Sequence, residues 1–388
     1  MKENWTYKKL GEVAYYPNKR IAMKELSQHP YVGVENLIKD KGGVSFSETI
    51  PCIDSAIECQ ENDILIGNIR PYLRKIWLSD QKVGASGDIV VIRISQDHVN
   101  KLAPKFLYTV LSSDLFFNYD NANTKGAKMP RGDRKAIANY IIPVPPLSEQ
   151  SRIVSELDIL QSIIDKQQAQ LKELDTLAQA VFYDMFGDPV ENEKGWEVKR
   201  LGDVCEVTSS KRVYQSEWRT FGIPFYRISD FTQLVNNVAF DAELFISPEK
   251  YDELKGNGQV PNAGDILVTS RGTLGNCYIV KNSDCFYFQD GMITWLKAID
   301  DSLLSLFIVF LFRNNSFRSQ IEKCQSGTTV AYLSISMLKK FKLPVPPLAL
   351  QQTFAEKIEA IEKQKATIAQ SIAETQKLFN YTMDKYFG

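Results

Sequence analysis

The sequence predicts a mixed α/β fold, with two tandem mixed α/β domains, each followed by a long α-helix, and the two helices pairing as a coiled coil. Three observations support this fold class. Motifs of the first half return in the same order in the second half. Each half ends in a 40-residue segment without proline. Both segments carry a heptad pattern, which indicates long paired helices.

The duplication rests on four landmarks, and repetition over such a distance indicates tandem domains. Two of the four repeat at the same offset of 201 residues. The landmarks are Trp5–Val13 (WTYKKLGEV) with Trp196–Val204 (WEVKRLGDV), Asn62–Ile66 with Gly264–Val268, Ile142–Leu147 (IPVPPL) with Leu343–Leu348 (LPVPPL), and Phe186-Gly187 with Phe387-Gly388.

Each half follows one plan. A block with β-branched and aromatic runs, such as 87–94 (GDIVVIRI), predicts strands. The PVPPL motif then ends a strand, because proline cannot donate to a central ladder. Ser148, followed by Glu149, is typical of a helix N-terminus. Asp188-Pro189 follows Gly187, as expected after a helix C-terminus.

The two proline-free segments carry apolar residues at steps of four and three, which is typical of a coiled coil. Polar residues interrupt the two patterns at different levels, which favours one register between unlike helices. Packing of each helix on its own domain is the alternative. The pattern comprises Ile153, Leu157, Leu160, Ile164, Gln167, Leu171, Leu174, Ala178, Val181 and Met185, then Phe354, Ile358, Ile361, Lys365, Ile368, Ile372, Thr375, Phe379, Thr382 and Tyr386.

The composition is that of a soluble globular protein, with 44% hydrophobic and 24% charged residues. The net charge of −1 is uneven, because residues 1–147 carry 20 basic and 16 acidic groups while residues 148–190 carry 3 and 8. A mildly basic first block permits DNA binding. Six cysteines without CxxC spacing and two histidines predict no metal site and a cytoplasmic location.

Catalytic motifs are not evident in the sequence. It contains neither the GxxxxGK[ST] loop of nucleotide-binding proteins nor the HExxH zinc motif. Asp188 with Glu197 and Lys199 resembles the acidic and basic spacing of metal-dependent nucleases. However, the first half has Thr6-Tyr7-Lys8 at the place of 197–199, which favours the start of a strand over a nuclease site.

Candidate DNA-binding residues lie in segments that follow predicted strands, in a second pair of loops before the PVPPL motif, and in a cation pair near the start of each block. Arginine reads guanine edges, and hydroxyl groups hold phosphate oxygens. Exposed surface charge in a hairpin turn is the alternative for any one of them. The candidates are Lys19, Arg20, Arg70, Tyr72, Arg74, Lys75, Lys125, Lys128 and Arg131 in the first half, and Lys211, Arg212, Ser270, Arg271, Thr273, Thr328, Thr329 and Tyr332 in the second.

Two blocks that open with Wx₄LG[DE]V, contain GDIL followed by arginine, and close with PxPPL before a long helix resemble the specificity subunits of type I restriction-modification systems. The resemblance covers essentially the whole chain. Leu147-Ser148-Glu149-Gln150 fits the family well, whereas the second copy has Leu350 where the family usually has glutamate.

The resemblance implies target-recognition domain 1 at 1–147, spacer helix 1 at 148–187, target-recognition domain 2 at 188–348 and spacer helix 2 at 349–388. It implies an antiparallel coiled coil and one half-site of a bipartite, asymmetric double-stranded DNA sequence per domain. The chain itself would be non-catalytic and bind no cofactor.

The resemblance also implies partners. Two modification (methyltransferase) subunits would carry S-adenosylmethionine, and restriction (translocase and nuclease) subunits would carry ATP and Mg²⁺, in defence against foreign DNA. Two alternatives stay open. The chain could be the specificity subunit of a modification-only or type IIB-like enzyme, or a coiled-coil protein–protein adaptor.

Overall fold

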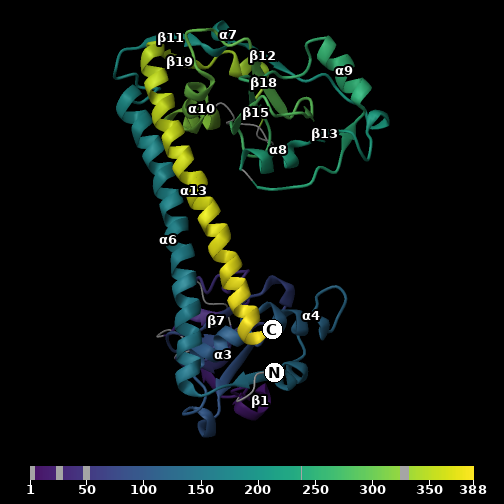
Figure 1. Ribbon diagram of the computed structural model, residues 1–388, viewed down its shortest axis with the longest axis vertical. Coiled ribbons are helices and arrows are strands. Elements are labelled where there is room, and N and C mark those ends of the chain that lie inside the picture. Colours follow the sequence, from purple (N-terminus) through teal and green to yellow (C-terminus); the bar gives the residue numbers. More distant parts are fainter. Residues whose placement is uncertain (1–4, 23–28, 47–52, 237, 324–331) are drawn as a thin grey trace. The chain divides into compact units, whose positions relative to one another are not determined.

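The computed structural model describes residues 5–22, 29–46, 53–236, 238–323 and 332–388 (Figure 1). The chain forms two compact units. Unit 1 comprises residues 1–168 and 370–388, and unit 2 comprises residues 169–369. Each unit therefore contains one mixed α/β block and a part of both long helices.

The described residues of unit 1 form three sheets. Strand β1 (Thr6–Lys9) pairs antiparallel with β10 (Ile141–Val144). A central sheet has the order β2-β9-β6-β7, made of Ala14–Tyr15, Ile89–Ile94, Ile64–Gly67 and Ile76–Leu78. A second sheet has the order β3-β5-β8-β4, made of Arg20–Ala22, Ser55–Cys59, Val83–Ala85 and Tyr31–Val32.

Unit 2 repeats this plan. Strand β11 (Glu197–Arg200) pairs antiparallel with β19 (Lys342–Val345). The central sheet has the order β12-β18-β15-β16, made of Glu206–Ser209, Ile293–Lys297, Ile266–Thr269 and Cys277–Ile279. The third sheet has the order β14-β13-β17, made of Phe245–Ile246, Ile223–Tyr226 and Tyr287–Phe288.

Some of the short helices recur in both units. In unit 1 they are α1 (Leu10–Val13), α3 (Pro104–Leu111), α4 (Asp114–Ala122) and α5 (Arg134–Asn139), with 3-10 turns at Pro71–Leu73 and Gln96–His98. In unit 2 they are α7 (Leu201–Val204), α8 (Ile228–Val235), α9 (Pro248–Gly256), α10 (Ser305–Arg313), α11 (Asn315–Lys323) and α12 (Ile335–Leu338), with a 3-10 turn at Gln215–Glu217.

The central sheet of each unit is buried on both faces. In β6 the side chains of Ile64 and Ile66 join the core under the helices, whereas Leu65 joins a second core shared with the other four-stranded sheet. In β15 Ile266 and Leu267 divide in the same way. Because neighbouring residues of a strand face opposite sides, the continuous apolar runs predict this double burial.

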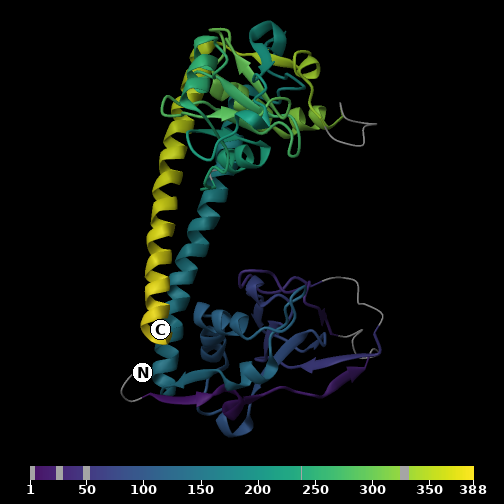
Figure 2. The same ribbon diagram turned by 90° about the vertical axis from the view of Figure 1, so that its right-hand side faces the viewer.

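The two long helices are α6 (Leu147–Phe186) and α13 (Leu348–Phe387), and each has 40 residues. Each begins one residue before the predicted helix and ends before the glycine. They lie side by side in both views (Figures 1 and 2). Residues near the start of one helix contact residues near the end of the other, so the helices are antiparallel.

Three contacts fix this direction. Within unit 1, Arg152 donates to the Tyr386 hydroxyl at 3.0 Å. Also in unit 1, Gln167 Nε2 donates to Ser371 Oγ at 2.7 Å. Within unit 2, Lys365 Nζ donates to Asp175 Oδ1 at 2.7 Å. The predicted fold class, with its helix pair, is confirmed.

The helices also pack on the blocks. Ile153 and Leu157 of α6 and Tyr386 of α13 belong to the core of unit 1. Phe182 of α6 and Phe354 of α13 belong to the core of unit 2, where their rings lie 5.6 Å apart. The helices therefore pair with each other and also pack on their domains, although the sequence pattern suggests these as alternatives.

Candidate DNA interface

Each candidate tip begins where a fully buried central strand ends. Strand β6 leads into segment 68–75, and β15 leads into segment 270–276. Buried strands hold the start of both segments at fixed positions, which is the arrangement in which loops on a rigid scaffold carry recognition residues.

The segment 68–75 of unit 1 has a strained backbone. Arg70 and Arg74 adopt left-handed φ angles of 52° and 50°, on either side of the 3-10 turn Pro71–Leu73. A residue with a side chain pays roughly 1–2 kcal/mol for this conformation, so surrounding contacts must hold it. Between the two arginines, Tyr72 is 52% exposed.

A second loop supplies those contacts. The Arg70 amide donates to Pro130 O at 2.8 Å, and the Gly132 amide donates to Asn68 O at 3.0 Å. Ile69 and Arg131 form an isolated antiparallel bridge. Segments 68–75 and 124–134, which the sequence names as separate candidates, are therefore one surface.

Unit 2 joins the equivalent segments. Arg271 and Tyr332 form an isolated antiparallel bridge, and the Leu333 amide donates to Ser270 O at 3.0 Å. The Arg271 guanidinium lies 5.1 Å from the centre of the Tyr332 ring, within cation–π range. Tyr332 stands 201 residues after Arg131, so the same bridge recurs at the same place in the repeat.

Several cationic candidates already pair with carboxylates. Salt bridges join Arg74 to Asp114 at 3.0 Å, Lys125 to Asp133 at 2.6 Å, Arg131 to Asp88 at 3.1 Å, Lys19 to Glu58 at 2.9 Å, and Arg212 to Asp290 at 2.8 Å. Apart from the pair with Glu58, whose side chain is 5% exposed, such pairs lie at an exposed surface and are worth little, so DNA phosphates can replace these carboxylates at small cost. The side chains of Arg70 and Lys128 have no carboxylate within 4.0 Å among the described residues.

The remaining candidates differ in accessibility. Arg20 donates to Ser55 Oγ at 2.7 Å and to its carbonyl at 2.8 Å. The exposed Lys211 is held through its backbone, which bonds the Tyr287 hydroxyl in both directions. Thr273 is exposed and uses its carbonyl to accept from Thr269. Thr328 and Thr329 lie outside the described residues.

Two candidate side chains form hydrogen bonds inside the domain. Ser270 is 1% exposed and its hydroxyl bonds that of Thr294, so the prediction that this hydroxyl contacts DNA does not fit its burial. Lys75 donates its Nζ to Val34 O at 2.6 Å and so joins two loops. Both placements satisfy polar groups inside the domain, as buried polar groups require.

Sequence reasoning missed the residues beneath the unit 1 loops. A Cβ added to Gly132 would lie 2.7 Å from Asp120 Oδ1 and 2.9 Å from Asn68 Oδ1, so only glycine fits between them. Neither oxygen has a hydrogen-bond partner among the described residues. Burial raises the pKa of the Asp120 carboxyl to about 6. The Arg131-Gly132-Asp133 sequence is the one signal that could have drawn attention to this position.

The helix pair buries the predicted heptad positions. Leu157, Ile164, Ile358 and Ile361 are buried, at 7% exposure or less. Leu160, Leu171, Leu174, Ile368, Ile372 and Phe379 are half-buried. Lys365 occupies the seam position that Ile164 holds 201 residues earlier, and it bonds Asp175 and Glu362.

Described residues contain no cluster of three or more His, Cys, Asp or Glu side chains able to hold a metal ion. The nuclease-like spacing is also explained, because Asp188 accepts from the Val190 and Glu191 amides and from Ser316. Glu197 and Lys199 lie in strand β11. In the described part of the chain, no helix has the length and hydropathy needed to span a bilayer.

The chain contains a duplicated mixed α/β domain and an antiparallel helix pair. In each copy of the domain, a backbone bridge joins two candidate loops. These features define a modular recognition protein. Comparison with known proteins gives the family. Residues 2–176 and 193–377 match the type I restriction modification DNA specificity domain. The chain therefore belongs to this family, as a non-catalytic specificity subunit that recognises DNA targets within a type I restriction-modification complex.

Individual relatives agree. The chain is 26% identical to the type I restriction enzyme MjaVIII specificity subunit of Methanocaldococcus jannaschii, over 93% of this chain and 86% of the relative. It is 20% identical to the EcoBI specificity subunit of Escherichia coli, over 86% and 73% of the two chains.

Solved structures share the fold. A chain from a study of complex assembly and conformational transition of the type I R-M system has a TM-score of 0.62 at 22% identity, covering 100% of this chain and 98% of that one. The specificity subunit from M. genitalium has a TM-score of 0.54 at 15% identity, covering 99% and 96%.

Proposed function

We propose that this subunit binds a bipartite, asymmetric DNA sequence, with one half-site read by each domain. The observation that carries the proposal is the recurrence of the same loop joint, at Ile69 with Arg131 and at Arg271 with Tyr332. The cations on the two tips differ in number and position, so we expect the two half-sites to differ. Arg70 and Arg271 are the proposed base-reading residues, because arginine pairs bidentately with guanine.

The other exposed cations contact phosphates in this proposal. Lys125, Lys128 and Arg131 surround the tip of unit 1, and Lys211 and Arg212 lie in unit 2. Phosphate contacts fix the register of a protein on the duplex but carry no base information. Because each phosphate contact releases counterions from the DNA, binding should depend on salt.

The helices serve as the docking surface for two modification subunits in this proposal. Their outward faces expose large apolar side chains that the seam does not use, namely Ile159 (59%), Leu177 (47%), Leu378 (52%) and Tyr381 (67%). Exposed apolar residues of this size mark interaction surfaces. S-adenosylmethionine, ATP and Mg²⁺ are then handled by the modification and restriction subunits.

Methylation profiling of the host genome with and without this gene tests the proposal. We expect one bipartite methyladenine motif to be lost with the gene and restored by complementation. Loss of a single uninterrupted motif, or no change in methylation, contradicts the proposal. An unmethylated-plasmid challenge then separates a restricting system from a modification-only or type IIB-like one.

A further inference from the structure

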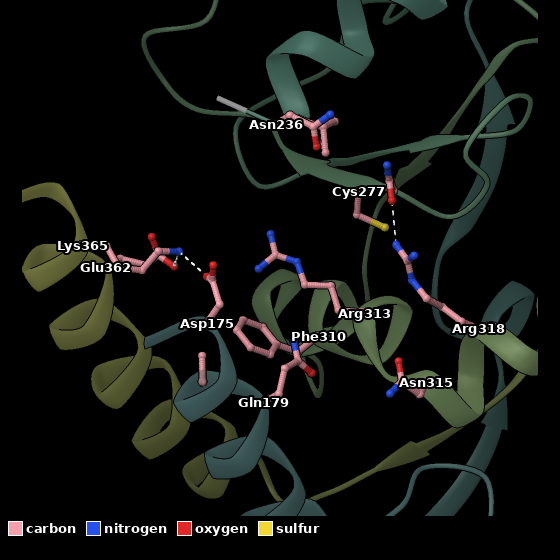
Figure 3. A pocket seen from close by; sticks show the side chains of 13 residues that line it. Asp175, Gln179, Asn236, Cys277, Phe310, Arg313, Asn315, Arg318, Glu362 and Lys365 are labelled. Carbon is pink, nitrogen blue, oxygen red and sulfur yellow. Dashed lines mark hydrogen bonds and ion pairs between the residues drawn. The ribbon is translucent and has the colours of Figure 1, made fainter. Parts of the chain in front are cut away.

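Unit 2 contains a polar pocket of about 430 Å³ that the DNA tips do not include (Figure 3). It lies beside α10 and α11 and is closed on one side by the helix pair. Arg313, the last residue of α10, and Arg318 of α11 both line it. Asn236, Asn276 and other amide side chains complete its polar wall.

Neither arginine has an acidic partner among the described residues. Arg318 donates to Phe312 O at 3.1 Å and to Asn276 Oδ1 at 2.6 Å, which leaves further guanidinium donors unused. The Arg313 guanidinium lies 5.3 Å from the centre of the Phe310 ring. Among the described residues, no carboxylate oxygen approaches either guanidinium within 4.0 Å.

Both positive charges lie near one buried thiol. Both guanidinium groups lie close enough to the Cys277 thiol to favour its thiolate, although burial outweighs them and raises the thiol pKa to about 12. Two like charges beside a buried group repel each other in a medium of reduced dielectric constant. An anion between them relieves this repulsion.

The two acidic groups of the pocket share one lysine. Asp175 and Glu362 line the wall formed by the helix pair, and both bond Lys365 Nζ, at 2.7 and 3.0 Å. Figure 3 shows both carboxylates bonded to this lysine rather than to the arginines. The pocket therefore keeps an excess of positive charge on its α10–α11 side.

The first repeat shows that the fold does not need these arginines. A pocket of about 720 Å³ occupies the same place in unit 1, lined by Ser112 at the position of Arg313. Phe117, which is buried, stands at the position of Arg318. The cations of that pocket have carboxylate partners, with Lys41 and Arg74 on Asp114 and Lys105 on Asp158.

We propose that Arg313 and Arg318 bind a phosphate group of the DNA backbone in this pocket. Guanidinium groups bind phosphate through paired N–H donors, and amide side chains add donors to the same oxygens. The contact with Asn276 joins Arg318 to the end of the segment 270–276, which carries the second DNA tip. The inference rests on the proposed function and adds a phosphate anchor whose two arginines are replaced by Ser112 and Phe117 in the first domain.

Salt-dependent DNA binding by the assembled complex tests the inference. Duplexes with and without the target sequence are titrated with the wild-type complex and with complexes carrying R313Q, R318Q or both. R200Q is the matched control, because Arg200 is an exposed cation of β11 in the same unit, outside the pocket. R313Q also controls for folding, because the Arg313 guanidinium has no hydrogen bond that its loss would break among the described residues.

We expect the double variant to lower the slope of log Kd against log salt by about 0.9, since the contact with one phosphate is lost. The affinity for both duplexes should fall by the same factor, and R200Q should bind as the wild type does. An unchanged slope overturns the inference, as does a loss confined to the target duplex.

Two further outcomes separate the possible failures. If the double variant folds but no longer assembles with the modification subunits, the arginines hold a partner's carboxylate and the inference is wrong. If the wild type does not distinguish the two duplexes, the proposed function fails, whereas the slope on either duplex still reports the phosphate contact.

Discussion

Gln150 and Gln351, 201 residues apart, make the same three hydrogen bonds at the start of the two long helices. Each side-chain oxygen accepts the amide of the residue that precedes a neighbouring helix, Ala103 at 2.8 Å and Leu304 at 2.9 Å. Each side-chain amide donates to two backbone carbonyls. Both glutamines are completely buried. They fix each long helix to its own domain.

Replacing Gln150 or Gln351 by alanine should therefore destabilise the unit that contains it. The change leaves three backbone groups without this partner, one of them in a buried hydrogen bond and two in part-buried ones, and a buried unpaired group costs about 1–3 kcal/mol. Urea denaturation should report a loss on the order of 3 kcal/mol for either variant. Gln168→Ala, at an exposed position of α6, is the control and should lose less than about 0.5 kcal/mol. Equal stability of the two glutamine variants and the control would contradict the anchoring of the long helices by these glutamines.

Asp120→Asn should stabilise the chain above pH 6. Burial raises the folded-state pKa of this carboxyl to about 6, from about 3.9 in an unfolded chain. The folded chain thus holds the proton more tightly, so the stabilisation is complete below about pH 4 and is lost as pH rises through 6.

The free energy of unfolding of D120N relative to wild type should therefore increase by on the order of 2 kcal/mol between pH 4 and pH 8. Urea midpoints at several pH values measure it. Asp97→Asn changes an exposed carboxyl and should show no such trend. A difference between D120N and wild type that is independent of pH contradicts the protonation of Asp120.

Gly132→Ala should disturb the joint between the two loops of unit 1. The added Cβ would approach Asp120 Oδ1 to 2.7 Å, and such overpacking costs about 1–3 kcal/mol. We expect weaker DNA binding together with lower stability. Gly87→Ala is the matched control, because a Cβ there meets nothing within 4 Å. If both variants bind DNA as the wild type does, the loops act independently.

Leu160→Asp should separate the helix pair, because a carboxylate would enter the seam without a partner. The melting temperature should fall by several degrees, as expected for a loss of about 3 kcal/mol. Ile159→Asp alters the adjacent residue, which is 59% exposed, and should keep the melting temperature while weakening the docking of modification subunits. Similar melting of the two variants would argue against a coiled-coil seam.

The sequence predicts the long helices and their seam closely, because proline-free length and heptad spacing are local properties. It also predicts which strands repeat. The burial of Ser270 depends on Thr294, which lies in a different strand, and the anchoring of Lys75 depends on a carbonyl 41 residues away. Such long-range partners leave no local pattern, so these residues resemble exposed tip residues in the sequence.

The bridge between the two loops can be predicted from the sequence only in part. The offset of 201 residues aligns Arg131 with Tyr332, but their pairing with Ile69 and Arg271 is a tertiary feature. The arginine pair of the unit 2 pocket was missed for a related reason. Arg313 ends α10 and Arg318 lies within α11, and in the sequence each resembles an ordinary surface cation of a helix.

The central claim is that each domain reads its own half-site, and binding of the complex to half-site variants tests it most directly. Discrimination is measured for wild type, R70A and R271A on duplexes mutated in one half-site at a time. We expect R70A to lose about 1–3 kcal/mol of discrimination at one half-site only, and R271A to lose a similar amount at the other. Equal loss at both half-sites for either variant, or no loss for both, would contradict the claim.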